Sequence, residues 1–184
     1  VKGTNTSGYG IEDTAGSGNI VHNSGTVTWD TGGLSTMYAK STFNDIEVIT
    51  SGTDMRWFGT LTLAGDLSVA ANTDVYEHIT AGGNLSITGD VAVSGKLGNS
   101  DANKEYSFGS LTIASGGEYY ATSGTTTLTD EKDHSGDGYA WHNSGTFTHN
   151  NGKVKVDFSS INKTTFLFEN TFYENANEFE QGIL

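Results

Sequence analysis

A short unit of glycine followed by alternating apolar and polar residues recurs through the middle of the chain, and it constrains the fold more than any other feature. The unit is Gly-x-apolar-polar-apolar, and it occupies residues 59–63, 65–69, 83–87, 89–93 and 109–113. Because successive side chains of a strand point to opposite faces, each unit predicts a short strand with one apolar face. The glycine at its start permits a sharp bend or a positive φ between strands.

The spacing of these units predicts how the strands are arranged. Paired units start six residues apart, and the pairs return after 24 residues (Gly59 to Gly83) and then after 26 (Gly83 to Gly109). Such a period favours a chain that winds round an axis and stacks the apolar face of each turn on the turn below. We therefore predict an all-β parallel β-helix, or β-solenoid, with coils of about two dozen residues, in which Leu61, Leu85 and Leu111 are superimposed.

A β-sandwich or meander is the alternative, since hairpin-linked strands show the same alternation. The usual hairpin signals are scarce, because Asn-Gly and Asp-Gly each occur once, at residues 151–152 and 137–138. This scarcity favours the solenoid.

The composition narrows the class of protein. The 184 residues include 25 Gly, no Pro and no Cys, and the net charge is -13. Thr, Ser, Asn and Gly interleaved with β-branched and aromatic residues are typical of strands with one solvated face. The acidic balance and the single arginine, Arg56, argue against binding to nucleic acid.

No apolar run approaches the ~18 residues of a membrane span, so no span is expected. The absence of cysteine excludes a disulfide or a thiolate metal site.

Three segments are expected along the chain. Residues 1–19 are rich in Gly, Ser and Thr and predict a linker or a first loose strand. Residues 20–164 hold the strand units and form the repeat domain. Residues 165–184 carry an aromatic cluster among acids, which predicts either a cap on the last coil or a strand shared with another subunit.

A longer sequence motif occurs twice, once near each end of the repeat domain. Residues 21–28 read VHNSGTVT and residues 141–148 read WHNSGTFT, identical at six of eight positions, and each is followed by an aromatic segment, at 41–46 and 170–175. Together with the Gly-x-Leu units, this pattern from residue 20 to residue 173 resembles the repeat arrays of environmental bacterial adhesin-like proteins and of structural or fibre proteins of marine bacteriophages. The resemblance implies a structural part on an extracellular or virion surface, and it implies no catalytic residue.

An acidic loop at residues 130–138 is the sharpest candidate for a metal site. Asp133, Ser135 and Asp137 stand at alternate positions before Gly138, which matches the first half of a Ca²⁺ loop. The acid expected at the twelfth position is replaced by Ser144. A solvated turn is therefore the other interpretation, and no further cofactor is expected.

Six aromatic residues are candidates for contact with a sugar or with another subunit. Tyr and Trp are favoured at such contact surfaces, although ordinary core packing explains them equally well. The candidates are Trp29, Trp57, Tyr119, Tyr120, Tyr139 and Trp141.

Catalytic interpretations rest on two acids. Asp66 and Asp90 follow equivalent glycines 24 residues apart, so stacked coils would bring them within ~5 Å of each other, as in a glycoside hydrolase. Two solvated acids at corners are the favoured interpretation. His22 and His142 hold equivalent positions in the internal repeat, which favours a structural role for both.

We therefore expect a non-enzymatic structural module of an extracellular or virion surface appendage, such as a phage fibre. It would form homo-oligomers or head-to-tail assemblies and attach to host-surface glycans. A repeat domain of a bacterial cell-surface adhesin is the first alternative. A polysaccharide-degrading enzyme of tailspike type is the second.

Overall fold

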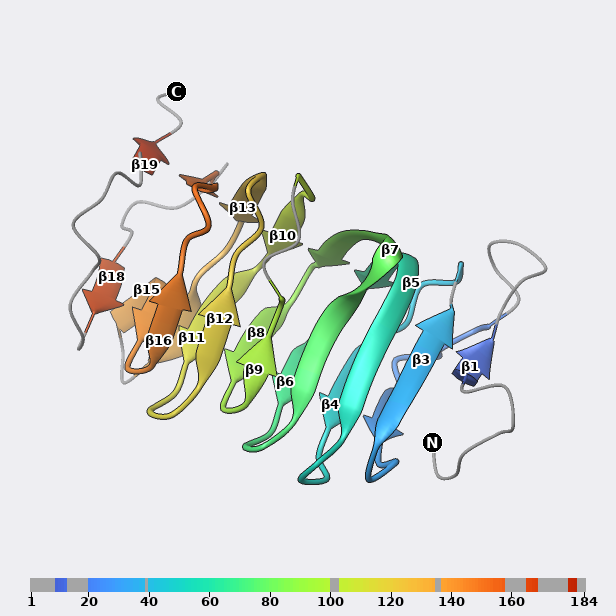
Figure 1. Cartoon of the computed structure of the whole chain (residues 1–184). Coiled ribbons are helices and arrows are strands. Elements are labelled where there is room, and N and C mark those ends of the chain that lie inside the picture. Colours follow the sequence, from blue (N-terminus) through green and yellow to red (C-terminus); the bar gives the residue numbers. More distant parts are fainter. Residues whose placement is uncertain are drawn as a thin grey trace.

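The chain forms a β-solenoid of about five turns, whose coils stack along one axis (Figure 1). The computed structural model describes residues 9–12, 20–38, 40–99, 103–134, 137–157, 165–168 and 179–181. All elements within these ranges are strands. The predicted all-β solenoid is confirmed, and the described residues contain no helix long and apolar enough to cross a membrane.

Two sheets make up the walls of the solenoid. The first, sheet A, has 11 strands: β1 (Tyr9–Glu12), β3 (Leu34–Tyr38), β5 (Asp54–Leu63), β7 (Asp74–Ile87), β9 (Lys96–Leu97), β10 (Tyr106–Phe108), β12 (Glu118–Tyr120), β13 (Thr125–Leu128), β16 (Thr146–Thr148), β17 (Lys153–Val156) and β19 (Phe179–Gln181). The second, sheet B, has eight: β2 (Thr26–Trp29), β4 (Asp45–Val48), β6 (Leu67–Val69), β8 (Asp90–Val93), β11 (Ser110–Ile113), β14 (Lys132–His134), β15 (Asp137–Asn143) and β18 (Thr165–Phe168).

Each coil passes once through sheet B and twice in succession through sheet A. In the earlier coils the two runs of sheet A belong to one long bent strand, such as β7, whereas in later coils they separate into pairs such as β9 and β10. Among the described strands, every pairing is parallel except that of β14 with β15. Parallel stacking of equivalent runs is what a winding chain must produce, and it excludes the hairpin-linked sandwich.

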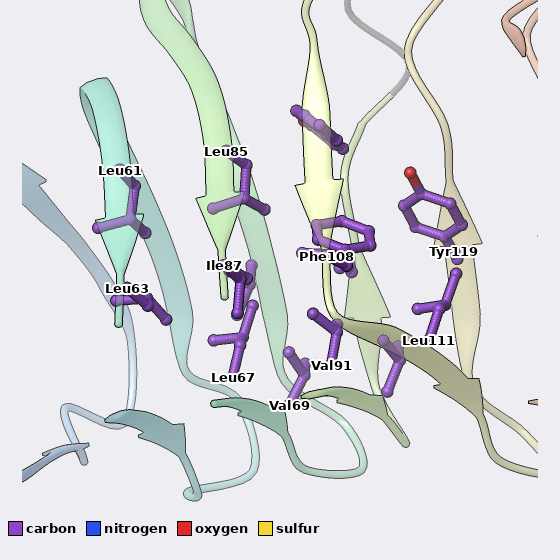
Figure 2. Packing of buried hydrophobic residues seen from close by; sticks show 14 of the residues in the cluster. Leu61, Leu63, Leu67, Val69, Leu85, Ile87, Val91, Phe108, Leu111 and Tyr119 are labelled. Atoms are coloured by element: carbon purple, nitrogen blue, oxygen red, sulfur yellow. The ribbon is translucent and has the colours of Figure 1, made fainter. Parts of the chain in front are cut away.

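The core is a column of aliphatic and aromatic side chains enclosed by the two sheets (Figure 2). Leu61 pairs with Leu85, and in sheet B the row Leu67, Val91 and Leu111 is superimposed. All five side chains are buried. Burial of such rows between successive coils supplies the main favourable free energy of folding.

The position predicted for Leu111 is wrong. It lies in sheet B over Val91, and the residue stacked on Leu85 in sheet A is Tyr106. The reason is that Tyr106-Ser107-Phe108 has the same apolar–polar–apolar alternation and takes the first position of its pair. Gly109 accordingly stacks on Gly89, whose carbonyl accepts the Gly109 N–H at 2.8 Å.

Coil length varies because residues are inserted at particular corners. Register in sheet A advances by 20 residues from Trp57 to Glu77, but by 24 from Leu61 to Leu85, because β7 bulges between them. The coil from Leu111 to Trp141 takes 30 residues and includes the β14–β15 hairpin. From the sequence, residues 70–81 predict a loop or a less regular third side of the coil, and in the structure most of them form the first half of β7.

The two copies of the internal repeat occupy different places in a coil. His22 and its three following residues precede β2 of sheet B, whereas His142 lies within β15 and the same motif leads into β16 of sheet A. The two histidines are equivalent in the sequence repeat but not in their places in a coil, and the structural role predicted for them stays a prediction. Strands β18 and β19 extend sheets B and A beyond β15 and β17. The cap or inter-subunit role predicted for residues 165–184 stays a prediction, because most of that segment lies outside the described residues.

Candidate functional site

Four of the six aromatic candidates lie in the core and cannot contact a sugar or another subunit. Trp29, Trp57, Tyr119 and Trp141 are all at most 1% exposed. Trp57 points inward with Met55, two residues before it on β5, because strand side chains alternate between faces. The core-packing alternative accounts for them, and the glycan-contact prediction for these four is wrong.

The other two aromatic candidates are partly exposed. Tyr120 lies on the outer face of sheet A, where the Lys96 ammonium sits 4.6 Å from the centre of its ring. Tyr139 is tilted against the His142 ring, with centroids 5.9 Å apart. The two tyrosines lie in different sheets, on β12 and β15, so they do not form one aromatic surface.

The acidic segment proposed for calcium contains a β-hairpin. Asp133 pairs with Gly138 and His134 pairs with Asp137 across β14 and β15. Paired extended strands differ from the continuous curved loop that wraps a Ca²⁺ ion. Ser135 lies outside the described residues, so the proposed three-residue set is not tested as a whole. Within the described ranges, no group of three or more His, Asp and Glu side chains is placed to hold a metal.

The carboxylates of Asp66 and Asp90 stack on successive coils, as their spacing predicts, and each is used by the fold. The Asp66 N–H donates to the Asp45 carboxylate at 2.9 Å, the Asp90 N–H donates to Asp66 at 2.8 Å, and the Ser110 hydroxyl donates to Asp90 at 2.6 Å. These three carboxylates form an aspartate ladder along one corner of sheet B. The ladder borders a shallow groove of about 230 Å³.

Two glycines make this ladder sterically feasible. A Cβ at Gly65 would overlap the Asp45 carboxylate, and one at Gly89 would overlap that of Asp66. Neither glycine has a positive φ, so the Gly-Asp dipeptide is required by close approach and not by a left-handed turn. The unit's glycine thus makes room for the acid of the preceding coil.

We expect Asp66→Ala to lower the free energy of unfolding by about 1 kcal/mol, because the Asp90 N–H loses its acceptor at a solvated corner. Asp66→Asn keeps a side-chain oxygen and should cost less. Urea unfolding of both variants measures the difference, with Ser68→Ala on the same strand as the control. Equal losses for Asn and Ala would show that the hydrogen bond contributes nothing.

One buried carboxylate interrupts the apolar column. Glu77 is fully buried in the row of Met37 and Trp57, and its Oε2 accepts the Tyr106 hydroxyl at 2.7 Å. Its Oε1 has no hydrogen-bond partner. The alternation of β7, in which Val75 is also buried, places Glu77 inward, and the sequence analysis did not identify this exception to an apolar core.

The hydroxyl of Tyr119 is buried nearby and touches that of Thr126, with 2.6 Å between oxygens. Burial raises the pKa of Tyr119 far above its ordinary value of 10.0, and the negative charge of Glu77 adds to this effect. The neutral phenol is thus the form that the folded state accommodates. The unfolded chain loses this proton near pH 10, so the contribution of Tyr119 to stability is constant below that pH and declines above it.

The expected result is that the free energy of unfolding falls by about 1.4 kcal/mol per pH unit above pH 10 on account of Tyr119. Urea unfolding at several pH values, from neutral to about one unit above pH 10, measures the slope. Tyr119→Phe should remove this part of the slope. An identical slope in the variant would contradict burial of the phenol.

A second groove, which the sequence analysis missed, lies at the corner where sheet B passes into sheet A. It has a volume of about 390 Å³ and is lined by turns of three consecutive coils and by Asp74, Lys96 and Glu118. These three residues pair in register at the starts of β7, β9 and β12. They are spaced 22 residues apart, and each follows Asn-Thr or Gly. This regular spacing of charged residues is the sequence pattern that could have predicted the groove.

Charges along this second groove influence one another. Burial raises the pKa of Asp74, Asp54 raises it further, and Lys96 opposes the change. A hydrogen bond to the Glu118 carboxylate is the main cause that raises the pKa of Tyr120. The groove therefore carries a row of alternating charge, with a carboxylate on either side of one ammonium.

Comparison of the chain with protein-family models, with curated proteins and with solved structures found no significant match. The fold and the site geometry are therefore the basis for any statement about function.

Proposed function

We propose that the chain is a structural module of an extracellular or virion surface appendage, such as a phage fibre, which supports assembly and attachment to a host surface. The observation that carries this proposal is the continuous stack of coils. Parallel backbone ladders run through both sheets, and one apolar column fills the space between them. A stack of this kind extends along one axis and keeps its shape through contacts between neighbouring coils.

The outer surface is compatible with a place in solvent on an appendage. The net charge of -13 favours solubility and disfavours association with polyanions. Exposed side chains of the described strands include Thr26, Glu47 and Ser68. A rigid acidic rod of this kind suits a spacer or a platform that presents binding groups.

The ends of the stack supply the expected mode of assembly. Within the described part of the chain, β2 is the end strand in the order of sheet B and pairs with β4. Edge strands are templates for addition of another strand. We propose that copies of the chain, or neighbouring segments of a larger assembly, join at such edges as homo-oligomers or head to tail.

The stacking of Asp66 and Asp90 gives only weak support to the alternative that the chain is a polysaccharide-degrading enzyme. An oxygen of Asp66 accepts the Asp90 backbone N–H, and Asp90 in turn accepts from Ser110. These bonds occupy the two carboxylates in holding coils together. We therefore keep the proposal of a non-enzymatic role, and hydrolysis of host glycans that is lost in Asp66→Asn and Asp90→Asn would overturn it.

Immunogold electron microscopy tests the proposal. Antibodies raised against the purified chain would be applied to virions and to bacterial cells that carry the gene for it, with pre-immune serum as the control. Label along tail fibres or other virion projections supports the phage-fibre form. Label on cell surfaces supports the adhesin alternative, and label confined to the cell interior contradicts both.

A further inference from the structure

The groove of about 390 Å³ at the corner between sheets B and A has the form of a binding site for an extended ligand. Its floor crosses three consecutive coils, at the turns that lead into β7, β9 and β12. Asn72, Ser94 and Ser115 contribute amide and hydroxyl groups from these turns, and Asp74, Lys96 and Glu118 line it beside them. Since neighbouring strands lie about 4.8 Å apart, the row from the first to the last coil spans roughly 10 Å.

The polar groups of this groove retain hydrogen-bonding capacity, in contrast to those of the aspartate ladder. Asp45, Asp66 and Asp90 each accept a hydrogen bond from the next coil. No such bond to the next coil is made by the Asp74 carboxylate, and no ion pair within 4.0 Å involves it in the described part of the chain.

Lys96 is held in position without being neutralised. Its ammonium lies over the Tyr120 ring, 4.6 Å from the centre of that ring. A cation over an aromatic ring keeps its N–H donors available to a ligand on its open side. The groove thus offers carboxylate acceptors, ammonium donors and neutral amide and hydroxyl groups within one row.

We propose that this groove binds a neutral oligosaccharide. A sugar chain is an extended ligand whose hydroxyl groups both donate and accept, which matches acceptors and donors that alternate from coil to coil. The excess of carboxylates over ammonium repels acidic sugars and other polyanions. A metal ion fits poorly, because Lys96 stands between Asp74 and Glu118 and those acids are two coils apart. The lining also lacks the apolar side-chain pockets that a peptide strand uses for specificity.

The Asp74 carboxylate does not contribute to the stability of the fold, which leaves it available for a role in binding. Burial, and then the charge of Asp54, raise the pKa of Asp74, so the fold disfavours the charged form of this carboxyl. Asp74→Asn should therefore fold as well as the parent, which makes it a clean variant for a binding test. This inference depends on the groove and not on the appendage role, so either can fail without the other.

The test is isothermal titration of the whole chain with maltohexaose, cellohexaose and chitohexaose, after a screen on an array of neutral and acidic glycans. Hexagalacturonate and Ca²⁺ alone are the probes for the other ligand classes. We expect a neutral oligosaccharide to bind and its affinity to fall about tenfold or more in Asp74→Asn and in Lys96→Gln, because each loses a hydrogen bond to a charged group. Glu47→Gln, a matched change on the outer face of sheet B, should leave affinity unchanged.

Four results would overturn the proposal. One is the absence of binding to any neutral glycan on the array. Another is neutral-sugar binding that survives both Asp74→Asn and Lys96→Gln. The third is preference for hexagalacturonate, and the fourth is binding of Ca²⁺ that Asp74→Asn abolishes. Thermal unfolding of each variant confirms that a lost affinity does not reflect a lost fold, and Glu118→Gln replaces Lys96→Gln if the latter does not fold.

Discussion

Trp141→Ala is expected to lower the free energy of unfolding by about 3–5 kcal/mol, the cost of removing a large side chain from a packed core. Trp141 is 0% exposed and lies across the Phe147 ring, with centroids 4.7 Å apart and planes at 84°. It also pairs in register with Leu111 of the coil below. Removal therefore opens a cavity between two coils, and urea unfolding followed by circular dichroism measures the loss.

Tyr139→Ala on the same strand is the matched control. The Tyr139 ring is partly exposed, so this substitution removes less buried area. It should cost clearly less than the tryptophan variant. A Trp141→Ala protein as stable as the parent would mean that this aromatic side chain is not part of the core. Trp141→Ala should lose sugar binding only at temperatures at which it unfolds, and it should bind normally well below its melting temperature.

Gly98→Ala is the second change with a large expected effect, about 2–5 kcal/mol. Two costs combine at this position. Gly98 has φ +83°, which a residue with a Cβ adopts only with strain, and the added Cβ would overlap the carbonyl oxygen of Tyr120 in the next coil. Because that oxygen belongs to the backbone, relief requires a coil to shift, and calorimetry or urea unfolding measures the result.

Two other glycines separate the two costs. Gly52→Ala keeps the positive φ, at +80°, but the new Cβ meets nothing within 4 Å, so only the strain of about 1–2 kcal/mol remains. Gly109 has no positive φ, and its Cβ would lie 2.5 Å from the Gly89 oxygen, so Gly109→Ala isolates the steric cost. If Gly98→Ala cost no more than Gly52→Ala, the close packing of coils at Gly98 would be wrong.

The repeat unit predicted the fold because it encodes a local property. Alternation in residues 59–63 and 83–87 requires strands with one apolar face, and the regular return of the unit requires those faces to stack. The period was less reliable than the unit. Gly83 to Gly109 is not one coil, because the bulge in β7 and the Tyr106–Phe108 strand change which unit lies over which.

The direction of the aromatic side chains could not be predicted from alternation alone. Trp141 and Tyr139 lie two residues apart on β15, yet one is fully buried and the other is partly exposed. The register of the pairing between β15 and β18 shifts between these two positions, and the adjacent Ala140 and Trp141 are both buried, so simple alternation fails there. Similarly, Asp74, Lys96 and Glu118 are ordinary turn-proximal charges in the sequence, and only the stacking of coils brings them into one groove.

An identical tetrapeptide shows the limit of local sequence most clearly. His-Asn-Ser-Gly at residues 22–25 forms a tight turn, with φ of 44° at Asn23 and 58° at Ser24. At residues 142–145 the same four residues leave a strand without any positive φ, because His142 and Asn143 pair with Thr112 and Ile113 of the coil below. The ladder hydrogen bonds with β11 outweigh the turn preference of the motif.

The sequence by itself determined that this protein is built of short strands with hidden aliphatic rows that wind as a solenoid, since alternation and glycine spacing act within a few residues. Only the tertiary structure decided which rows superimpose, which aromatic rings are buried and which charges share a groove. These depend on the number of residues inserted at each corner, and one inserted bulge shifts every contact between that coil and the next.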